Sequence, residues 1–337
     1  MPPPWPGPSS TPQASTSAPT KQRTSCRCWA GAASFASACR PRKAGPAAVP
    51  ALTAAFVFWG QRTFIEYLLQ SPNASLRERW LAALLEGSFA GATGLSNAMK
   101  YLSGIESLQI SATPEGKEWR LNGRLPWVTN LRLAGFAVAA AVAPTDGLPP
   151  AVVAFAHDTP GIRRSADLDL LALRGSNTAA IDLDYVPSSA ADVIHADARS
   201  FLPQVRPAFL GMQCGMSIGL ARASLGAARD SGSAVRASIE PRIQALEAAM
   251  AKTVTQLHDG LDNGRFATQA AALFLIRIHL ASMVRQAADL ELDASGGRAY
   301  LTQTSGDFAR RWLEAAFVPV VTPSLTQLHV ELERQAA

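Results

Sequence analysis

Cysteines, histidines and long apolar runs are scarce in this chain of 337 residues. The four cysteines (Cys26, Cys28, Cys39 and Cys214) form neither a disulfide framework nor a zinc-ligand spacing, so we expect a reducing, cytoplasmic location. The five histidines have no metal-ligand spacing either, and we expect no bound metal. The longest apolar runs, such as 136–144, are far shorter than the ~20 residues that cross a bilayer, so we expect no membrane insertion.

Several functional motifs and a basic surface are also missing. The sequence contains no GxGxxG segment, no phosphate-binding P-loop and no nucleophile elbow. The net charge of +5 arises in residues 1–45, which hold six basic residues and no acid. The remaining 25 basic residues face 26 acidic ones, so we expect no nucleic-acid partner.

Residues 1–49 differ in composition from everything that follows. They are rich in proline, serine, threonine and alanine, and they show neither a helical nor a strand period. Such a segment buries too little apolar area to offset the entropy of ordering, so we expect it to be irregular and disordered. A transit peptide has a similar composition, but the initial prolines argue against its amphipathic helix. We prefer a misread frame or wrong start joined to a real protein body.

The rest of the chain predicts an α+β multidomain fold. Residues 50–90 show helical spacing, with Ser75 and Glu78 as a capping box, and indicate a partial N-terminal helical domain. Residues 91–200 contain short strands and turns, typical of a small middle β-barrel domain, and Asn122-Gly123 predicts a hairpin turn. Residues 201–337 contain amphipathic helices with short links, which indicate a C-terminal four-helix bundle.

Three segments resemble motifs of the acyl-CoA dehydrogenase family, in the family's order and at its spacing. Residues 121–130, LNGRLPWVTN, resemble the family's NGxKxWITN segment. Residues 158–162, DTPGI, are similar to its TPG turn, and residues 173–187 resemble its GxRxSxTxxVxF segment with the VxVP that follows. Weaker similarity extends from about residue 55 to 335. The family's N-terminal helical domain is incomplete here, because residues 1–49 occupy its place.

The resemblance implies a flavoprotein and a substrate. It implies a homodimer or homotetramer that binds FAD between the β domain and the bundle, with an acyl-CoA in the adjoining cleft. The implied reaction is α,β-dehydrogenation of the thioester, with hydride transfer to N5 of FAD and a possible electron-transfer flavoprotein as partner.

The resemblance also assigns flavin contacts. A flavin needs a flat apolar wall and hydrogen-bond donors near N1, O2 and N5. Trp127, in the segment Trp127-Val128-Thr129, matches the tryptophan that packs on the ring, and Thr129 matches the threonine whose hydroxyl reaches N5. The family's TExxxGSD segment is altered here, so that Ser96 or Asn97 would donate to the ring edge. Alternatively, Trp127 is an ordinary core tryptophan, and Ser96 and Asn97 belong to an ordinary polar loop.

Two further segments correspond to contacts with the FAD tail. Arg236 lies near the family arginine that pairs with pyrophosphate across a subunit interface, although the Phe-Gly that follows it is missing. Gly296-Gly297 matches a glycine pair that lets a helix end approach FAD. Alternatively, Arg236 is a solvated arginine at a helix start, and Gly296-Gly297 only ends a helix.

The catalytic glutamate of the family is absent at both of its known places. Thr322 occupies the expected position in the last helical region, and residues 206–210 contain no acid at the other. A threonine is far too weak a base, and we interpret Glu314 and Glu331 as surface groups. Two alternatives to dehydrogenation therefore stay open. One is a monooxygenase of the same superfamily that uses reduced FMN supplied by a reductase, and the other is a non-catalytic paralogue.

Overall fold

The computed structural model describes residues 52–102, 104–231, 236–303 and 306–336. The disorder expected for residues 1–49 lies outside these ranges. The described chain begins with two helices, α2 (Leu52–Gln70) and α3 (Ala74–Glu86). The strands follow, and the remaining long helices come last, so the predicted mixture of helices and a sheet is confirmed.

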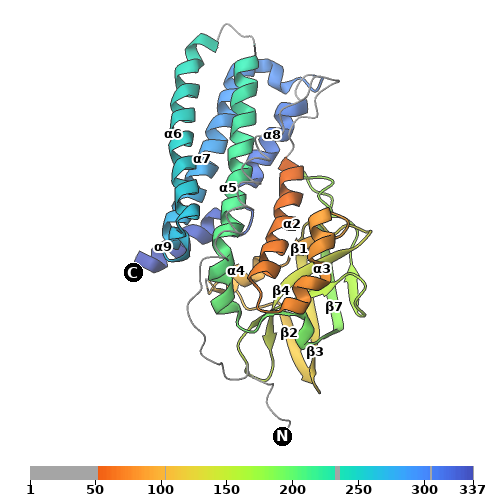
Figure 1. The fold of residues 1–337 in the computed structure, drawn as a ribbon. Coiled ribbons are helices and arrows are strands. Elements are labelled where there is room, and N and C mark those ends of the chain that lie inside the picture. Colours follow the sequence, from red (N-terminus) through yellow and green to blue (C-terminus); the bar gives the residue numbers. More distant parts are fainter. Residues whose placement is uncertain (1–51, 103, 232–235, 304–305, 337) are drawn as a thin grey trace.

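Eight strands form one sheet beside the helices (Figure 1). Their order is β6-β7-β3-β2-β4-β5-β8, and β1 pairs with β4 in parallel. The two end strands of this path, β6 and β8, do not pair with each other among the described residues, so the barrel layout of the predicted middle β domain is not confirmed. The strands are β1 (Ala90–Thr93), β2 (Ile110–Glu115), β3 (Glu118–Val128), β4 (Phe136–Pro144), β5 (Ala151–Ala156), β6 (Ile162–Arg164), β7 (Ala179–Ser188) and β8 (Val193–His195).

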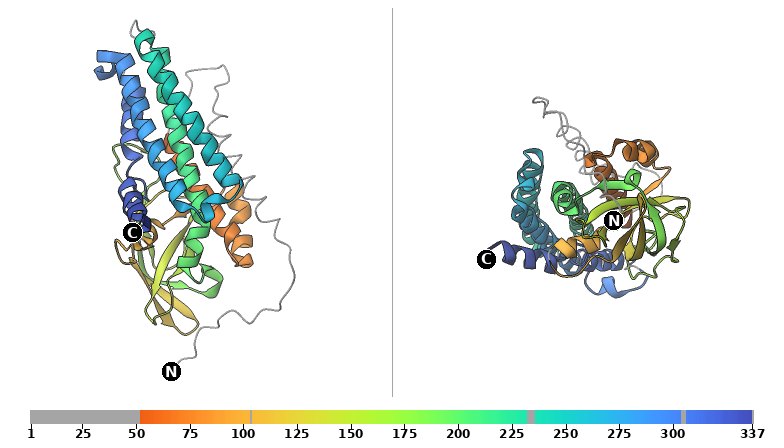
Figure 2. Two further views of the ribbon diagram at one scale, coloured as in Figure 1. Left: turned by 90° about the vertical axis from the view of Figure 1, so that its left-hand side faces the viewer. Right: turned by 90° about the horizontal axis from the view of Figure 1, so that it is seen from below.

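Three long helices, α5, α6 and α7, lie side by side above the sheet (Figures 1 and 2). The shorter α8 and α9 pack against α7, and α2 packs against both α5 and strand β1. Strand β4 joins the two regions because its small residues Ala137, Ala139 and Ala141 face the helical core, whereas its larger residues face the core inside the sheet. The helices are α4 (Ser96–Leu102), α5 (Ala198–Asp230), α6 (Arg236–Asp262), α7 (Ala270–Ser295), α8 (Gly306–Phe317) and α9 (Leu325–Ala336).

The hairpin turn predicted at Asn122-Gly123 is wrong. Both residues lie inside β3, and the chain turns instead between Glu115 and Glu118, where Gly116 has a φ of 62°. Gly123 sits at an irregularity in the pairing of β3 with β7, with a φ of 150°. A Cβ atom there would lie 2.1 Å from the carbonyl oxygen of Gln109, so this glycine permits a close backbone approach.

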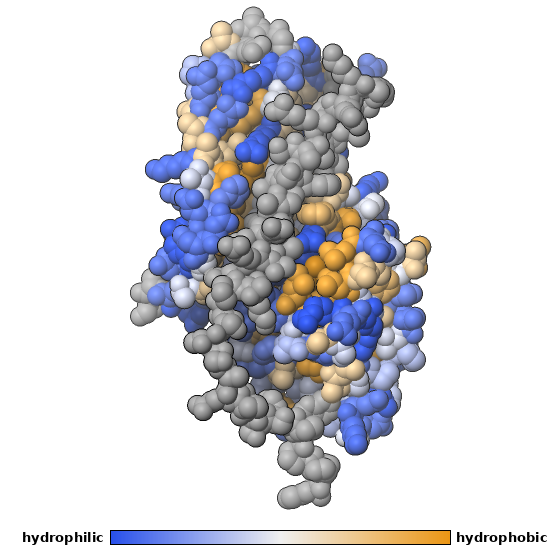
Figure 3. Space-filling model, in the orientation of Figure 1, coloured by the Kyte–Doolittle hydropathy of each residue, from blue (hydrophilic) through white to orange (hydrophobic). Residues whose placement is uncertain are grey.

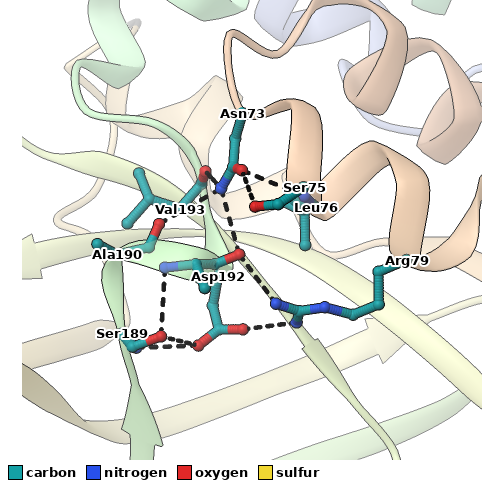
Figure 4. A network of polar contacts seen from close by, with 9 residues as sticks. Asn73, Ser75, Leu76, Arg79, Ser189, Ala190, Asp192 and Val193 are labelled. Carbon is teal, nitrogen blue, oxygen red and sulfur yellow. Dashed lines mark hydrogen bonds and ion pairs between the residues drawn. The ribbon is translucent and has the colours of Figure 1, made fainter.

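The start of α3 also differs from the prediction. Asn73, and not Ser75, caps the helix, because its side-chain oxygen accepts a hydrogen bond from the N–H of Leu76 at 3.1 Å. The amide of Asn73 donates to the carbonyl of Val193 at 3.0 Å, and Arg79 pairs with Asp192 at 2.8 Å (Figure 4). Asparagine and serine cap helices about equally well, and only asparagine has an amide that can also tie α3 to the sheet.

Figure 3 shows apolar side chains gathered at the surface over α2, on the face that it draws.

Within the described residues, the helical stretch 270–300, which contains α7, is long and apolar enough to cross a membrane by length and composition alone. Half of its most apolar window is buried in the protein, and it packs against α5, α6, α8 and α9, as the core helix of a bundle does.

Candidate functional site

A cavity of about 570 Å³ opens between the sheet and the helices. Its wall combines α2, the segment 93–109, the end of β3, the loop 170–178 and the link 317–327 between α8 and α9. Ligand pockets in proteins commonly measure about 300–1,000 Å³, so the cavity has room for a cofactor ring and part of a substrate.

The cavity brings together six of the residues predicted for the site. Trp127, Val128 and Thr129 lie on its wall at the end of β3. The other three that line it are Ser96, Asn97 and Thr322.

Gly296 and Gly297, two of the residues predicted for the FAD tail, do not line this cavity. Arg236 is the first residue of α6, and Gly296 follows the last residue of α7. Both helix ends lie at the end of the bundle that is remote from the sheet (Figure 1). Gly296 has a φ of 55° and its N–H bonds to the carbonyl of Leu292, so it does end α7. A cofactor contact by Arg236, Gly296 and Gly297 stays a prediction.

Trp127 is not a core residue. Its surface is 64% exposed, although most other large apolar residues of the sheet are buried. The neighbouring wall contains Leu125, Pro126 and Val128. An exposed indole beside an apolar cavity wall is available to stack on a planar ligand.

Thr129 belongs to a short chain of hydroxyl groups. Its Oγ1 lies 2.9 Å from Oγ1 of Thr178, which lies 2.7 Å from Oγ of Ser176. Thr129 and Thr178 line the cavity, whereas Ser176 is buried behind them. The hydroxyl of Thr129 is therefore held at the cavity wall, at the position that the sequence assigned to a flavin contact.

The amide of Asn97 is fully used inside the protein. Its nitrogen donates to Glu106 Oε1 and to the carbonyl of Ser107, both at 2.9 Å, and its oxygen accepts from the N–H of Gln109 at 2.8 Å. Both amide hydrogens of Asn97 are therefore used within the protein, and none is left for the predicted donation to a cofactor. Ser96 is half-buried and lines the cavity, and its hydroxyl has no partner among the described residues.

Glu106 is a cavity residue that the sequence analysis missed. It is the only carboxylate among the described lining residues, and Lys100 lies 3.2 Å from it. Burial raises the pKa of Glu106, but the hydrogen bond from Asn97 and the ammonium of Lys100 outweigh burial and bring the pKa below its ordinary value. A carboxylate with a lowered pKa is a poor proton acceptor, so Glu106 does not replace the missing base.

This lowered pKa predicts how Glu106 affects stability. The group contributes stability above the ordinary pKa range of a glutamate, and the contribution is lost as the pH falls through the lower pKa of the folded state. We expect Glu106→Gln to lower the melting temperature at neutral pH, and the difference from wild type to shrink toward about pH 3. Melting curves of both proteins across that range measure it. A difference that grows toward low pH would contradict the lowered pKa.

Thr322 is positioned by two buried polar residues that the sequence analysis also missed. The amide of Gln213 donates to the carbonyl of Thr322 at 2.8 Å, and Arg277 Nη2 donates to the carbonyl of Val318 at 2.6 Å. Arg277 Nε also donates to the amide oxygen of Gln213 at 3.3 Å. Helices α5 and α7 thus hold the link that carries Thr322 and Val320 into the cavity wall.

The interpretation of Glu314 as a surface group is wrong. Its side chain is fully buried, accepts from the N–H of Leu52 at 3.2 Å and pairs with Arg310 at 2.9 Å. Burial raises the pKa of Glu314, and the nearby Arg310 only partly opposes this. Glu331 is half-buried and pairs with Arg334. Neither glutamate lines the cavity, so neither is placed to act as a base there.

Comparison with known proteins gives partial sequence matches. No protein-family model matches the sequence. The isovaleryl-CoA dehydrogenase of Pongo abelii is 28% identical over 134 residues, which are 39% of this chain and 31% of that protein. The Bacillus subtilis protein named "Probable acyl-CoA dehydrogenase YngJ" is 29% identical over 130 residues, which are 37% of this chain and 33% of that protein. The chain thus matches about a third of the length of these curated relatives.

Solved structures match over most of the chain. A glutaryl-CoA dehydrogenase in complex with glutaryl-CoA has a TM-score of 0.73 at 17% identity, with 85% of this chain and 76% of that chain covered. Butyryl-CoA dehydrogenase from Megasphaera elsdenii has a TM-score of 0.69 at 18% identity, covering 85% and 79%. KijD3 in complex with FMN and a dTDP-amino sugar has a TM-score of 0.69 at 19% identity, covering 85% and 75%. The described chain therefore has the fold of the acyl-CoA dehydrogenase family.

Proposed function

We propose that this chain is a flavin oxidoreductase that binds FAD in the 570 Å³ cavity and dehydrogenates an acyl-CoA thioester between its α and β carbons. The observation that carries the proposal is the exposed Trp127 beside the wall-bound hydroxyl of Thr129. The curated relatives and the solved structures include acyl-CoA dehydrogenases, which supports the same chemistry.

The cavity residues fit a flavin in shape and polarity. Trp127 offers an aromatic face, while Leu125 and Val128 continue the apolar wall. Thr129 and Ser96 place hydroxyl groups at the same cavity, and such donors stabilise the negative charge that collects on a flavin ring. When bound, the flavin would accept a hydride from the substrate. The protein's own part is to orient the ring, and to exclude water with Phe317, which lines the cavity.

The remote FAD-tail residues support a proposal about assembly. Arg236 and Gly296-Gly297 lie at the end of the bundle away from the cavity of their own chain (Figure 1). They can serve a cofactor only if another copy brings its cavity to them. We therefore propose a homodimer or homotetramer built from a partial helical domain, a middle β domain and a C-terminal bundle. The cytoplasmic location and the electron-transfer flavoprotein partner stay proposals of the same kind.

One observation favours a second function on the same fold. Thr322 stands at the position of the family's base, and the only carboxylate among the described lining residues, Glu106, is paired with Lys100. A monooxygenase that takes reduced FMN from a reductase needs no base for an α-proton. The structural match to KijD3, which was solved with FMN, supports this alternative.

The two functions predict different reactions of the purified protein. If it is a dehydrogenase, the absorption band of bound FAD bleaches when acyl-CoAs of varied chain length are added without oxygen. If it is a monooxygenase, reduced FMN drives oxygen consumption only when a substrate is present, and the oxygen consumed matches the substrate converted. Bleaching by any acyl-CoA supports the first function, and oxygen consumption without such bleaching supports the second. A protein that binds flavin and does neither would match the non-catalytic alternative.

Replacing Trp127 separates a ligand-binding role from a structural role. Because its side chain is 64% exposed, Trp127→Ala should change the melting temperature little. Loss of one aromatic stacking partner, worth about 0.5–1.5 kcal/mol, should weaken FAD binding about two- to tenfold. A fluorescence titration with FAD measures the change. Trp312→Ala in α8, at 40% exposure and outside the cavity, is the control and should bind FAD like wild type. Equal affinities of the two variants would remove Trp127 from the site.

A further inference from the structure

A second, small cavity lies behind the link between α8 and α9. It measures about 10 Å³, which is room for about one water-sized sphere. Phe317 and Val321 line both this cavity and the 570 Å³ cavity, so the two cavities share this part of their walls. The polar residues that line the small cavity are Gln213, Ser217 and Arg277.

Arg277 brings a buried positive charge to the small cavity. Its side chain is fully buried, and although burial lowers the pKa of Arg277, a guanidinium is basic enough to keep its proton in a protein. Nε donates to Gln213 and Nη2 to the carbonyl of Val318. Nη1 is also buried and has no hydrogen-bond partner among the described residues. A charged donor without a partner in the interior is strongly unfavourable.

No carboxylate side chain of this sequence balances that charge. The two described groups that bond to Arg277 are an amide and a backbone carbonyl, and the buried Glu314 pairs with Arg310 instead. Burial raises the pKa of the neighbouring Cys214 to about 12, so its thiol is uncharged at neutral pH. The residues outside the described ranges contain neither aspartate nor glutamate. The counter-charge must therefore come from outside the chain.

The other polar groups of the small cavity also have hydrogens to donate. Gln213 Nε2 carries two hydrogens, of which one goes to the carbonyl of Thr322 at 2.8 Å. The hydroxyl of Ser217 is 3.4 Å from the carbonyl of Gln213, which is a long contact that leaves it able to turn toward a better acceptor. A water molecule could accept from these groups, but it would leave the charge of Arg277 uncompensated.

We infer that the small cavity binds one monovalent anion of about the size of chloride, which pairs with Nη1 of Arg277. The space is too small for phosphate or for a carboxylate-bearing compound. The anion would complete the contacts by which Arg277 holds the carbonyl of Val318 and Gln213 holds that of Thr322. It therefore supports, from behind, the link that forms part of the wall of the large cavity. This inference does not depend on the proposed flavin site.

Urea denaturation at fixed ionic strength tests the anion site. Chloride is exchanged for gluconate, which is too large for the small cavity. Once chloride exceeds its dissociation constant, each further tenfold rise should increase the equilibrium constant for folding about tenfold, as one ion bound to the folded chain requires. Arg277→Met removes the charge and should abolish this dependence. Arg229→Met is the control and should keep it, because Arg229 pairs with Glu240 and Glu247 and does not line the cavity.

Backbone hydrogen exchange tests the effect on the cavity wall. The N–H groups of Val320 and Val321 bond to the carbonyl of Phe317 at 2.9 and 3.3 Å. Their exchange in wild type should be slower in chloride than in gluconate, by up to the factor by which chloride raises the equilibrium constant for folding. Equal exchange rates in the two salts would overturn the role of the anion in the wall.

A crystal of the wild-type protein soaked in bromide locates the ion without any variant. The anomalous signal of bromide should lie beside Nη1 of Arg277, and it should be missing from this place in Arg277→Met. A wild-type protein equally stable in chloride and gluconate, a chloride dependence that persists in Arg277→Met, or a wild-type crystal without bromide at Arg277 would overturn the inference. None of these measurements involves a flavin, so their outcomes are separate from those that test the proposed function.

Discussion

Thr322→Glu is expected to raise the rate of acyl-CoA dehydrogenation about 10²–10⁴-fold over wild type, the usual range for general-base assistance. Thr322 lines the cavity, and its backbone carbonyl is held by Gln213, so a longer side chain there starts from a fixed backbone. Glu106 is tied to Lys100 and Asn97 and does not substitute for a base. Wild type should therefore bleach its flavin only slowly with acyl-CoA. Anaerobic bleaching with a panel of acyl-CoAs measures both rates.

The control variant for this prediction carries a side chain of the same shape as glutamate but without its charge. Thr322→Gln places an amide where the carboxylate would lie, and it should gain nothing, because an amide does not take up a proton at neutral pH. Equal gains in both variants would mean that the longer side chain acts by packing. Brisk bleaching by wild type that persists in Thr322→Ala would show that another residue is the base.

Glu291→Ala is expected to lower the free energy of unfolding by about 3–5 kcal/mol, the usual loss when one partner of a buried ion pair is removed. Glu291 in α7 accepts hydrogen bonds from Nε and Nη2 of Arg311 in α8, and Nε lies 2.9 and 3.1 Å from its two carboxylate oxygens. Both side chains are less than a tenth exposed. Removal of Glu291 leaves the guanidinium of Arg311 buried without that partner. Urea denaturation curves give the free energies of both proteins.

Two further variants show whether burial is the cause. Arg311→Met combined with Glu291→Leu removes both charges and should restore most of the stability. Asp184→Ala breaks the ion pair with Arg163, in which both side chains are more than 60% exposed, and should lower the free energy of unfolding by no more than about 1 kcal/mol. A loss in Glu291→Ala as small as that in Asp184→Ala would show that the α7–α8 contact does not depend on this pair.

Local pattern predicted the elements whose burial repeats regularly along the chain. Residues 178–186 alternate apolar and polar, and in β7 Ile181 and Leu183 are buried while Asp184 is exposed. Asn122-Gly123 failed because the same dipeptide suits a hairpin turn and a strand irregularity. The choice between them depends on the approach of Gln109, which the local sequence does not contain.

The buried polar residues that the sequence analysis missed are those fixed by contacts distant in the sequence. Glu314 has the spacing of a surface residue on an amphipathic helix, yet the N–H of Leu52, 262 positions earlier, bonds to it inside the protein. Gln213 meets Thr322 across 109 positions, and Arg277 meets Val318 across 41. The family motif located Trp127 and Thr129 at the cavity, since a short segment carries both residues on one strand end.

The central claim is that this cavity binds a flavin, and a titration of the purified protein with FAD tests it most directly. The account predicts saturable uptake of one FAD per chain, with a shifted absorption band and with weaker binding in Trp127→Ala than in Trp312→Ala. A folded protein that leaves the FAD spectrum unchanged at saturating concentration, and that also takes up no FMN, would contradict the claim.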